Sequence, residues 1–132
     1  MDTILYPTAD KIIELNALAL TLLKVKKADS HKLLSRQKLS DSLHKCESYN
    51  GDIFDKAVVL LQELVQSHAF ASGNRRTAFI ATKYFLGLNK KKLKITDNPD
   101  HAKIMQGIRE NYYQHSEMKE WLQHGKIREF KR

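Results

Sequence analysis

The segment of residues 75–88 constrains the fold more than any other part of the sequence. Its apolar residues cover most of the circumference of a helix: Ala78, Phe79, Ile80, Ala81, Tyr84, Phe85, Leu86 and Leu88. A helix that is apolar nearly all round is usually buried at the centre of a bundle. We therefore expect other helices to surround it. Its first turn, after a break at Gly73 and a cap at Asn74, should lie deep in the structure.

Two helices are predicted in the first third of the chain. The first begins near Thr8 and carries a helix-period apolar stripe to about Lys24. The second is expected to start with Ser30 as its cap. Its apolar residues are Leu33, Leu34, Leu39 and Leu43.

A third helix follows the Asn50-Gly51 pair, a strong turn signal because both residues tolerate positive φ. Asp52 is expected to cap it. Its apolar face consists of Phe54, Ala57, Val58, Leu61, Leu64 and Val65. His68 is the next position on that face, so this histidine should end the helix facing the start of the buried one.

The C-terminal third predicts two more helices. Residues 97–99 supply a cap and a first-turn proline for a helix to about Tyr113, and Ser116 is expected to cap the last helix. Residues 93–95 alternate apolar and charged side chains and suggest a short strand or an extended piece. The chain of 132 residues thus predicts one domain, residues 1–132. The fold class is all-α, a compact bundle of about six helices with strand limited to a small β-hairpin.

Charge and cysteine usage narrow the class of protein. Lys and Arg number 23 against 15 for Asp and Glu, a net charge of +8 that favours polyanions, anionic nucleotides or an acidic partner protein. Cys46 is the only cysteine and is expected to be an inert packing residue in a reducing compartment. Because neither a secretory signal nor a membrane-length apolar run is visible, we expect a cytoplasmic protein without a membrane partner.

The segment HAFASGNRRTAF, residues 68–79, combines the parts of a phosphate-binding loop. Gly73 lets an anion approach the backbone, and the helix that follows presents free N–H groups and a positive dipole end. Arg75 and Arg76 add charge-assisted donors. A neutral His68 beside bound phosphates could take a proton from an incoming hydroxyl, as phosphoryl or nucleotidyl transfer requires.

Simpler interpretations stay open on residue chemistry alone. His68 could be a satisfied core or capping histidine, and the arginines could be solvated turn residues. Short basic helices could also lie on DNA, but the helix after the turn is too apolar for an exposed recognition helix, so no specific nucleic-acid partner is expected. The six histidines show no pair at i, i+3 or i+4 spacing, which argues against a zinc site.

The loop resembles the signature of the Fic/Doc family, His-x-Phe-x-acidic-Gly/Ala-Asn-Gly/Lys-Arg. The flanking stretches DIFDKAVVLLQELVQSH and TAFIATKYFLGLNKKKL and the closing SEMKEWL are similar to the death-on-curing branch. The resemblance covers most of the chain from about Leu33 onward. It implies a small α-helical fold and transfer of part of a nucleoside triphosphate, such as ATP, to a hydroxyl on a target protein.

Carried over residue by residue, the resemblance implies a role for each loop position. His68 would be the general base, and Phe70 would anchor the loop in the core. Gly73 would line the anion hole, Asn74 would hold a phosphate, and Arg76 would hold the more distal phosphates.

The resemblance also implies a flap ahead of the loop. Tyr49, Asn50 and Gly51 would belong to a β-hairpin flap that aligns the target as an added strand.

Two positions depart from the family pattern. Ser72 stands where an Asp or Glu usually binds the Mg²⁺ that bridges the phosphates, and a serine hydroxyl is a poor substitute for that ligand. The metal could then be held mainly by the phosphates and water, or the protein could be weakly active or a degenerate member that binds a nucleotide or partner without chemistry. Arg75 stands where AMP-transferring members have glycine and the death-on-curing branch has lysine. Because Arg75 is long and cationic like that lysine, the resemblance favours phosphate transfer by a kinase-like toxin, with AMP transfer as the alternative.

Family members are often restrained by an inhibitory Ser/Thr-x-x-x-Glu-Gly/Asn helix. The only near match, Ser116 to Glu120, is followed by Trp121 and is better explained as a capped C-terminal helix. We therefore expect restraint in trans by a separate antitoxin protein.

Overall fold

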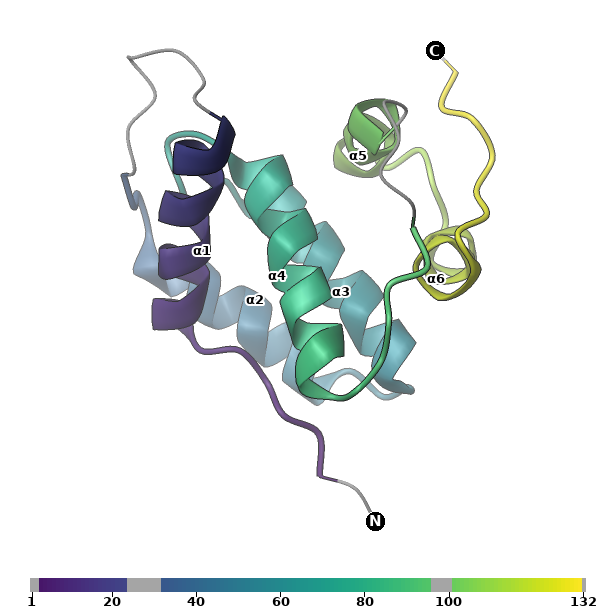
Figure 1. Ribbon diagram of the computed structural model, residues 1–132, viewed down its shortest axis with the longest axis horizontal. Helices are drawn as coiled ribbons and strands as arrows, with labels where there is room; N and C mark the ends of the chain where they lie inside the picture. The colour runs from purple at the N-terminus through teal and green to yellow at the C-terminus, as the bar shows by residue number, and fades with distance from the viewer. Residues whose placement is uncertain (1–2, 24–31, 96–100, 132) are drawn as a thin grey trace.

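The computed structural model describes residues 3–23, 32–95 and 101–131, which form a helical bundle (Figure 1). Its helices are α1 (Ala9–Leu23), α2 (Arg36–Ser48), α3 (Ile53–Ser67), α4 (Asn74–Leu88), α5 (His101–Arg109) and α6 (His115–His124). The all-α prediction is confirmed. The described residues contain no strand, only an isolated β-bridge between Leu33 and Phe70, so the small hairpin is absent from them. None of the described helices has the length and apolarity needed to cross a membrane.

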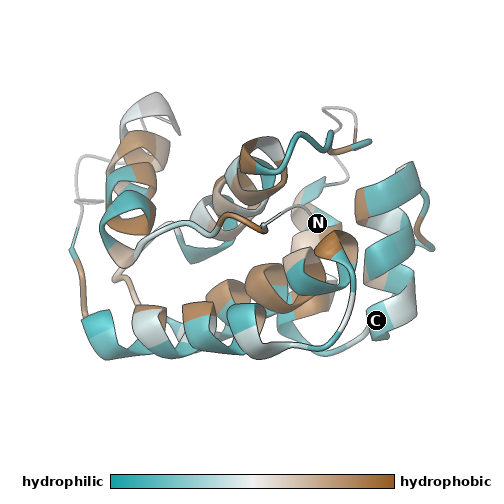
Figure 2. Cartoon of the chain, turned by 90° about the horizontal axis from the view of Figure 1, so that it is seen from below, coloured by the Kyte–Doolittle hydropathy of each residue, from teal (hydrophilic) through white to brown (hydrophobic). Residues whose placement is uncertain are grey.

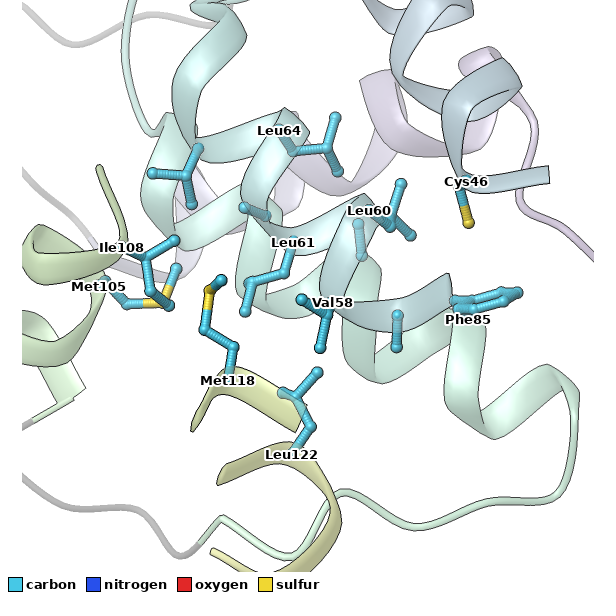
Figure 3. Close-up of a cluster of buried hydrophobic side chains, with 14 of the residues drawn as sticks. Cys46, Val58, Leu60, Leu61, Leu64, Phe85, Met105, Ile108, Met118 and Leu122 are labelled. Carbon is cyan, nitrogen blue, oxygen red and sulfur yellow. The ribbon is translucent and has the colours of Figure 1, made fainter. Parts of the chain in front are cut away.

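Helix α3 is the centre of the bundle. It packs against α2, α4, α5 and α6, whereas α4 packs mainly against α3 and α1. The apolar faces of the helices point toward one another and the hydrophilic faces point outward (Figure 2). Buried side chains from α2 to α6 meet around α3 (Figure 3): Cys46, Val58, Leu60, Leu61, Leu64, Phe85, Met105, Ile108, Met118 and Leu122.

The expectation that the first turn of α4 lies deep is only partly confirmed. Thr77 and Ala78 are buried, but Arg75 and Arg76 are exposed. A guanidinium group is costly to bury without a partner, so the basic turn stays at the surface while the apolar turns behind it are covered.

Cys46 is the packing residue that the sequence predicts. Its side chain is fully buried, with Sγ 3.4 Å from the carbonyl oxygen of Lys56. Burial raises the pKa of the Cys46 thiol to about 12. Because the thiolate is the reactive form, this cysteine should be inert in the folded protein.

Helix α2 begins later than predicted. Its cap is Ser35, whose Oγ accepts a hydrogen bond from the Lys38 N–H at 3.2 Å, while Ser30 lies outside the described residues. Leu33 and Leu34 precede the helix. The Leu34 N–H donates to the Ala69 carbonyl at 2.8 Å, and this tertiary pairing holds the segment extended.

The C-terminal helices also differ from the prediction at their ends. Helix α5 ends at Arg109 instead of near Tyr113, because Asn111 adopts a left-handed conformation with φ 59°. The predicted cap at residues 97–99 lies outside the described residues. Helix α6 is capped by Gln114 instead of Ser116, and the Gln114 N–H donates to the Glu117 carboxylate at 3.0 Å. Residues 93–95 form no strand.

Candidate functional site

Helix α3 ends at Ser67 and is followed by His68, the first residue of the predicted phosphate-binding loop. His68 is the C-cap and has left-handed backbone angles, φ 52° and ψ 47°, a conformation that costs a non-glycine residue of order 1 kcal/mol. This conformation ends the helix, and His68 is exposed although Leu64 and Val65 are buried. No side-chain hydrogen bond of His68 occurs within the described part of the chain. The interpretation of a core histidine is therefore wrong, whereas the alternative of a capping position is confirmed, since His68 is the C-cap of α3.

Asn74 closes the loop on itself. Its Oδ1 accepts a hydrogen bond from the Phe70 N–H at 3.2 Å, and its Nδ2 donates to the Phe70 carbonyl at 2.8 Å. Phe70 is only 3% exposed, so its side chain reaches the core. The N-cap of α4 is Gly73, and Asn74 is the first helical residue. The predicted cap at Asn74 is wrong because its amide is bound to Phe70.

An extended segment ahead of α2 lies along the same loop. The Ala71 N–H donates to the Lys32 carbonyl at 3.0 Å, and the N–H groups of Leu34 and Ser35 both donate to the Ala69 carbonyl. Sequence reasoning assigned this segment to a helix. The pairing joins residues far apart in the chain, so no local pattern predicts it.

The other side of the loop rests on α1. Asn16 is fully buried, and its Nδ2 donates to the Ser72 carbonyl and to Thr77 Oγ1, each at 3.0 Å. Gly73 has φ 77°, and a Cβ placed on it would lie 3.3 Å from Asn16 Nδ2 and 3.1 Å from Leu20 Cδ2. A side chain there would be strained and crowded, so glycine suits this position. Asn16 was missed, although a polar residue within the apolar stripe of α1 was a usable signal.

The N-terminus of α4 presents open donors. Within the described chain, no acceptor is bonded to the backbone N–H groups from Gly73 to Arg76, whereas the Thr77 N–H donates to the Gly73 carbonyl at 2.8 Å. Such N–H groups, together with the helix dipole, form an anion-binding site.

These features surround one cavity of about 800 Å³. The loop and α4 contribute His68, Ala71, Ser72, Gly73, Asn74, Arg75, Arg76 and Phe79; Val65 comes from α3, and His101, Ala102, Met105 and Arg109 come from α5. Three arginines thus line it, and none of the described lining residues is a carboxylate. The structure therefore brings the predicted loop residues together around a space suited to an anion.

Helix α5 supplies a wall that sequence reasoning missed. The His101 ring lies 5.3 Å from the Phe79 ring and 5.9 Å from the Trp121 ring, between centroids. Arg109, at the end of α5, brings the third arginine. Both residues follow the loop by more than 20 positions, and only the packing of α5 on α3 places them here.

The lining residues do not fit a magnesium ion well. Mg²⁺ prefers carboxylate oxygens, and Ser72 is the only hydroxyl that lines the cavity among the described residues. The Ser72 carbonyl is already bonded to Asn16. No described group of three or more His, Cys, Asp or Glu side chains could hold a metal ion.

The predicted target flap does not adjoin this cavity. Tyr49, Asn50 and Gly51 form a short loop before α3. Helix α3 has 15 residues with a rise of about 1.5 Å each, so roughly 22 Å separate this loop from His68 at the other end of the helix. The Tyr49 ring stacks on the His115 ring with centroids 5.4 Å apart. A hairpin is absent because α2 continues to Ser48 and α3 begins at Ile53.

Comparison with known proteins agrees with the loop and the fold. A sequence model of the Fic/DOC family matches residues 6–86, which is more than half of the chain. The chain is also similar to a protein named Toxin Doc from Mycolicibacterium smegmatis, with 42% identity over 50 residues. That match spans 38% of this chain and 38% of the length of the relative. Because the family match runs from α1 through the cavity-lining loop into α4, the chain belongs to the Fic/DOC family and is a Doc-like member.

Proposed function

We propose that this protein is a toxin-like transferase that moves the terminal phosphate of a nucleoside triphosphate, such as ATP, onto a hydroxyl of a target protein. One observation carries the proposal. The exposed imidazole of His68 and the open N–H groups of the α4 N-terminus line the same cavity. A proton acceptor beside an anion-binding helix end is the pairing that phosphoryl transfer needs.

Each loop residue has a distinct part in this proposal. His68 takes the proton of the incoming hydroxyl. Gly73 and the N–H groups after it bind phosphate oxygens, and Arg75 and Arg76 neutralise their charge. The Asn74 side chain holds Phe70, so Asn74 acts on phosphate through its backbone N–H and not through its amide.

In the reaction, the target oxygen forms a bond to the γ-phosphorus while the bond from that phosphorus to the β,γ-bridging oxygen breaks. The nucleoside diphosphate leaves, and the hydroxyl proton passes to His68. AMP transfer is the alternative, with attack at the α-phosphorus and pyrophosphate as leaving group. Arg75 favours the first reaction because it places a long cationic side chain where AMP-transferring members have glycine. Arg75→Gly should change the transferred group, and an unchanged group would contradict this assignment.

Labelling reactions test the proposal. Purified protein, a cell extract and either α- or γ-labelled ATP are incubated, with His68→Ala as the control. Label from the γ-position alone, lost in His68→Ala, is the expected result. Label from the α-position would mean AMP transfer.

Ser72 favours a second candidate, a degenerate member that binds a nucleotide without chemistry. No step of the reaction above is assigned to Mg²⁺, since the lining residues do not fit it. If only the metal ligand is missing, Ser72→Asp should raise labelling strongly when Mg²⁺ is added. No label from wild type or from Ser72→Asp would favour the binding protein.

We further propose cytoplasmic action and an antitoxin protein as the partner in trans, with no specific nucleic acid and no membrane involved. The relative's name, Toxin Doc, and the net charge of +8 support a toxin with an acidic partner. Expression of the protein alone should arrest growth, and His68→Ala should not. Harmless expression, with no binding partner recovered, would contradict the toxin proposal.

A further inference from the structure

Asn16 is a buried polar residue of α1 whose side chain connects this helix to the loop. Its two Nδ2 hydrogens are both used, one by the Ser72 carbonyl and one by Thr77 Oγ1, each at 3.0 Å. Ser72 lies just before Gly73, and Thr77 lies in the first turn of α4. The side chain of Asn16 therefore bridges the two sides of the loop-to-helix junction.

The bond to Ser72 determines which way the next N–H points. The peptide between Ser72 and Gly73 is trans and planar, so its C=O and N–H point in opposite directions. Because the carbonyl is bonded to α1, the Gly73 N–H is directed away from α1. Gly73 lines the cavity, and its N–H has no bonded acceptor within the described chain.

Packing against α1 reinforces this orientation. A Cβ on Gly73 would meet Leu20 at 3.1 Å and the Asn16 amide at 3.3 Å, so α1 contacts the backbone of the junction directly. Rotation of the peptide would break the hydrogen bond between the Ser72 carbonyl and the fully buried Asn16 side chain, which is unfavourable.

We propose that Asn16 is a positioning residue of the phosphate site, which holds the 72–73 peptide so that the Gly73 N–H faces the bound phosphate. The inference rests on the proposed function in assigning a phosphate group to the cavity. Asn16 does not line the cavity and does not touch the ligand.

A matched pair of variants tests this role without a large loss of packing. Thr77→Val removes one acceptor of Asn16 and keeps the bond to Ser72. Asn16→Leu combined with Thr77→Val keeps a similar core volume but removes that bond. Circular dichroism and thermal unfolding show whether both variants are folded, and titration calorimetry with inorganic tripolyphosphate measures binding.

We expect Thr77→Val to bind tripolyphosphate with the same affinity as wild type. The double variant should bind it about tenfold more weakly, because one well-oriented N–H donor is lost. In ¹⁵N–¹H spectra, tripolyphosphate should shift the Gly73 amide signal in Thr77→Val and not in the double variant. Equal affinities and equal Gly73 shifts in the two variants would overturn the inference.

The binding measurement separates this inference from the proposed transfer. If the double variant binds tripolyphosphate about tenfold more weakly than wild type, but no label is transferred from ATP, the proposed reaction fails while the role of Asn16 stands. If wild type does not bind tripolyphosphate, the loop is no phosphate site and the inference fails.

Discussion

The two ends of helix α3 are built in opposite ways. At its N-terminal end, Asp52 and Asp55 exchange hydrogen bonds in a capping box, and the Lys119 ammonium lies 3.1 Å from both carboxylates. His115 Nε2 lies 2.9 Å from Asp55 Oδ1. The Lys56 ammonium donates to three backbone carbonyls that end α2. Each of these charged groups has a partner in the chain.

At the C-terminal end, the polar groups remain open. His68 is exposed at a left-handed residue, and the backbone N–H groups from Gly73 to Arg76 have no bonded acceptor within the described chain. Arg75 and Arg76 are exposed beside them. The groups behind the loop are paired, through Asn74, through Asn16 and with the extended segment ahead of α2.

This difference assigns stability to the N-terminal end of α3 and ligand binding to its C-terminal end. Polar groups that already have hydrogen-bond partners stabilise the fold and cannot readily bind a ligand. Donors without a partner, when neighbouring hydrogen bonds hold them in place, are preorganised for ligand binding. We therefore expect changes at the C-terminal end to alter binding and transfer without altering stability. Changes at the N-terminal end should do the reverse.

The largest expected effect is that of His68→Ala on transfer. Loss of a general base lowers a transfer rate by about 10²- to 10⁴-fold. Because His68 is exposed, the free energy of unfolding should change by less than about 0.5 kcal/mol. Rates of γ-phosphate labelling and urea unfolding curves measure the two quantities.

His115→Ala is the matched control, a second histidine at the other end of the helix. It loses the contact with Asp55, so it should lower stability by about 1 kcal/mol and leave labelling unchanged. Equal losses of labelling in the two variants would remove the contrast between the ends.

Arg76→Gln should have the next largest effect, on the binding of tripolyphosphate. Loss of a charge-assisted hydrogen bond corresponds to about 2 kcal/mol, or roughly a 30-fold higher Kd. Lys119→Gln removes a cation from the paired end and should leave the Kd unchanged. An equal Kd for wild type and Arg76→Gln would mean that tripolyphosphate does not bind beside Arg76.

The paired end is tested by Lys56→Met. Lys56 is 8% exposed and donates to the carbonyls of Cys46, Glu47 and Tyr49 at 3.4, 2.7 and 2.8 Å. Methionine has a similar length but leaves these carbonyls without this donor, so unfolding should become easier by about 2 kcal/mol. Tripolyphosphate binding at 25 °C by the folded fraction should not change, and a matching loss of binding would mean that the two ends are coupled.

Sequence reasoning succeeded where the signals are local. The Asp52 cap and the apolar faces of α1, α3 and α4 depend on residues within a few positions of one another, and each helix formed near its predicted place. The loop motif is also local, and the site residues that it predicts, His68 and those that begin α4, line one cavity.

Sequence reasoning failed where distant segments meet. The pairing of Leu34 with Ala69 and the placement of Arg109 in the cavity depend on how the bundle packs. The prediction of a β-hairpin failed for a related reason. Asn50-Gly51 is a sound turn signal, but the same four-residue connection suits two helices as well as two strands, and the Asp52 capping box favours the helix.

The smallest expected effect concerns the pH dependence of stability through Asp55. Desolvation opposes ionisation of this carboxyl, but hydrogen bonds from His115, from the Asp52 N–H and from Lys119 outweigh it and lower its pKa. A carboxyl with a lowered pKa in the folded state contributes stability above its unfolded pKa of about 4, and this contribution is lost as the pH falls toward the folded pKa. Asp55→Asn should therefore be less stable than wild type at pH 7, by about 1 kcal/mol, and the two should converge toward pH 2. Urea unfolding from pH 7 to 2 measures this difference. A constant difference across that range would mean that the ion pairs at this end contribute little, and that the paired end of α3 is held by its backbone caps alone.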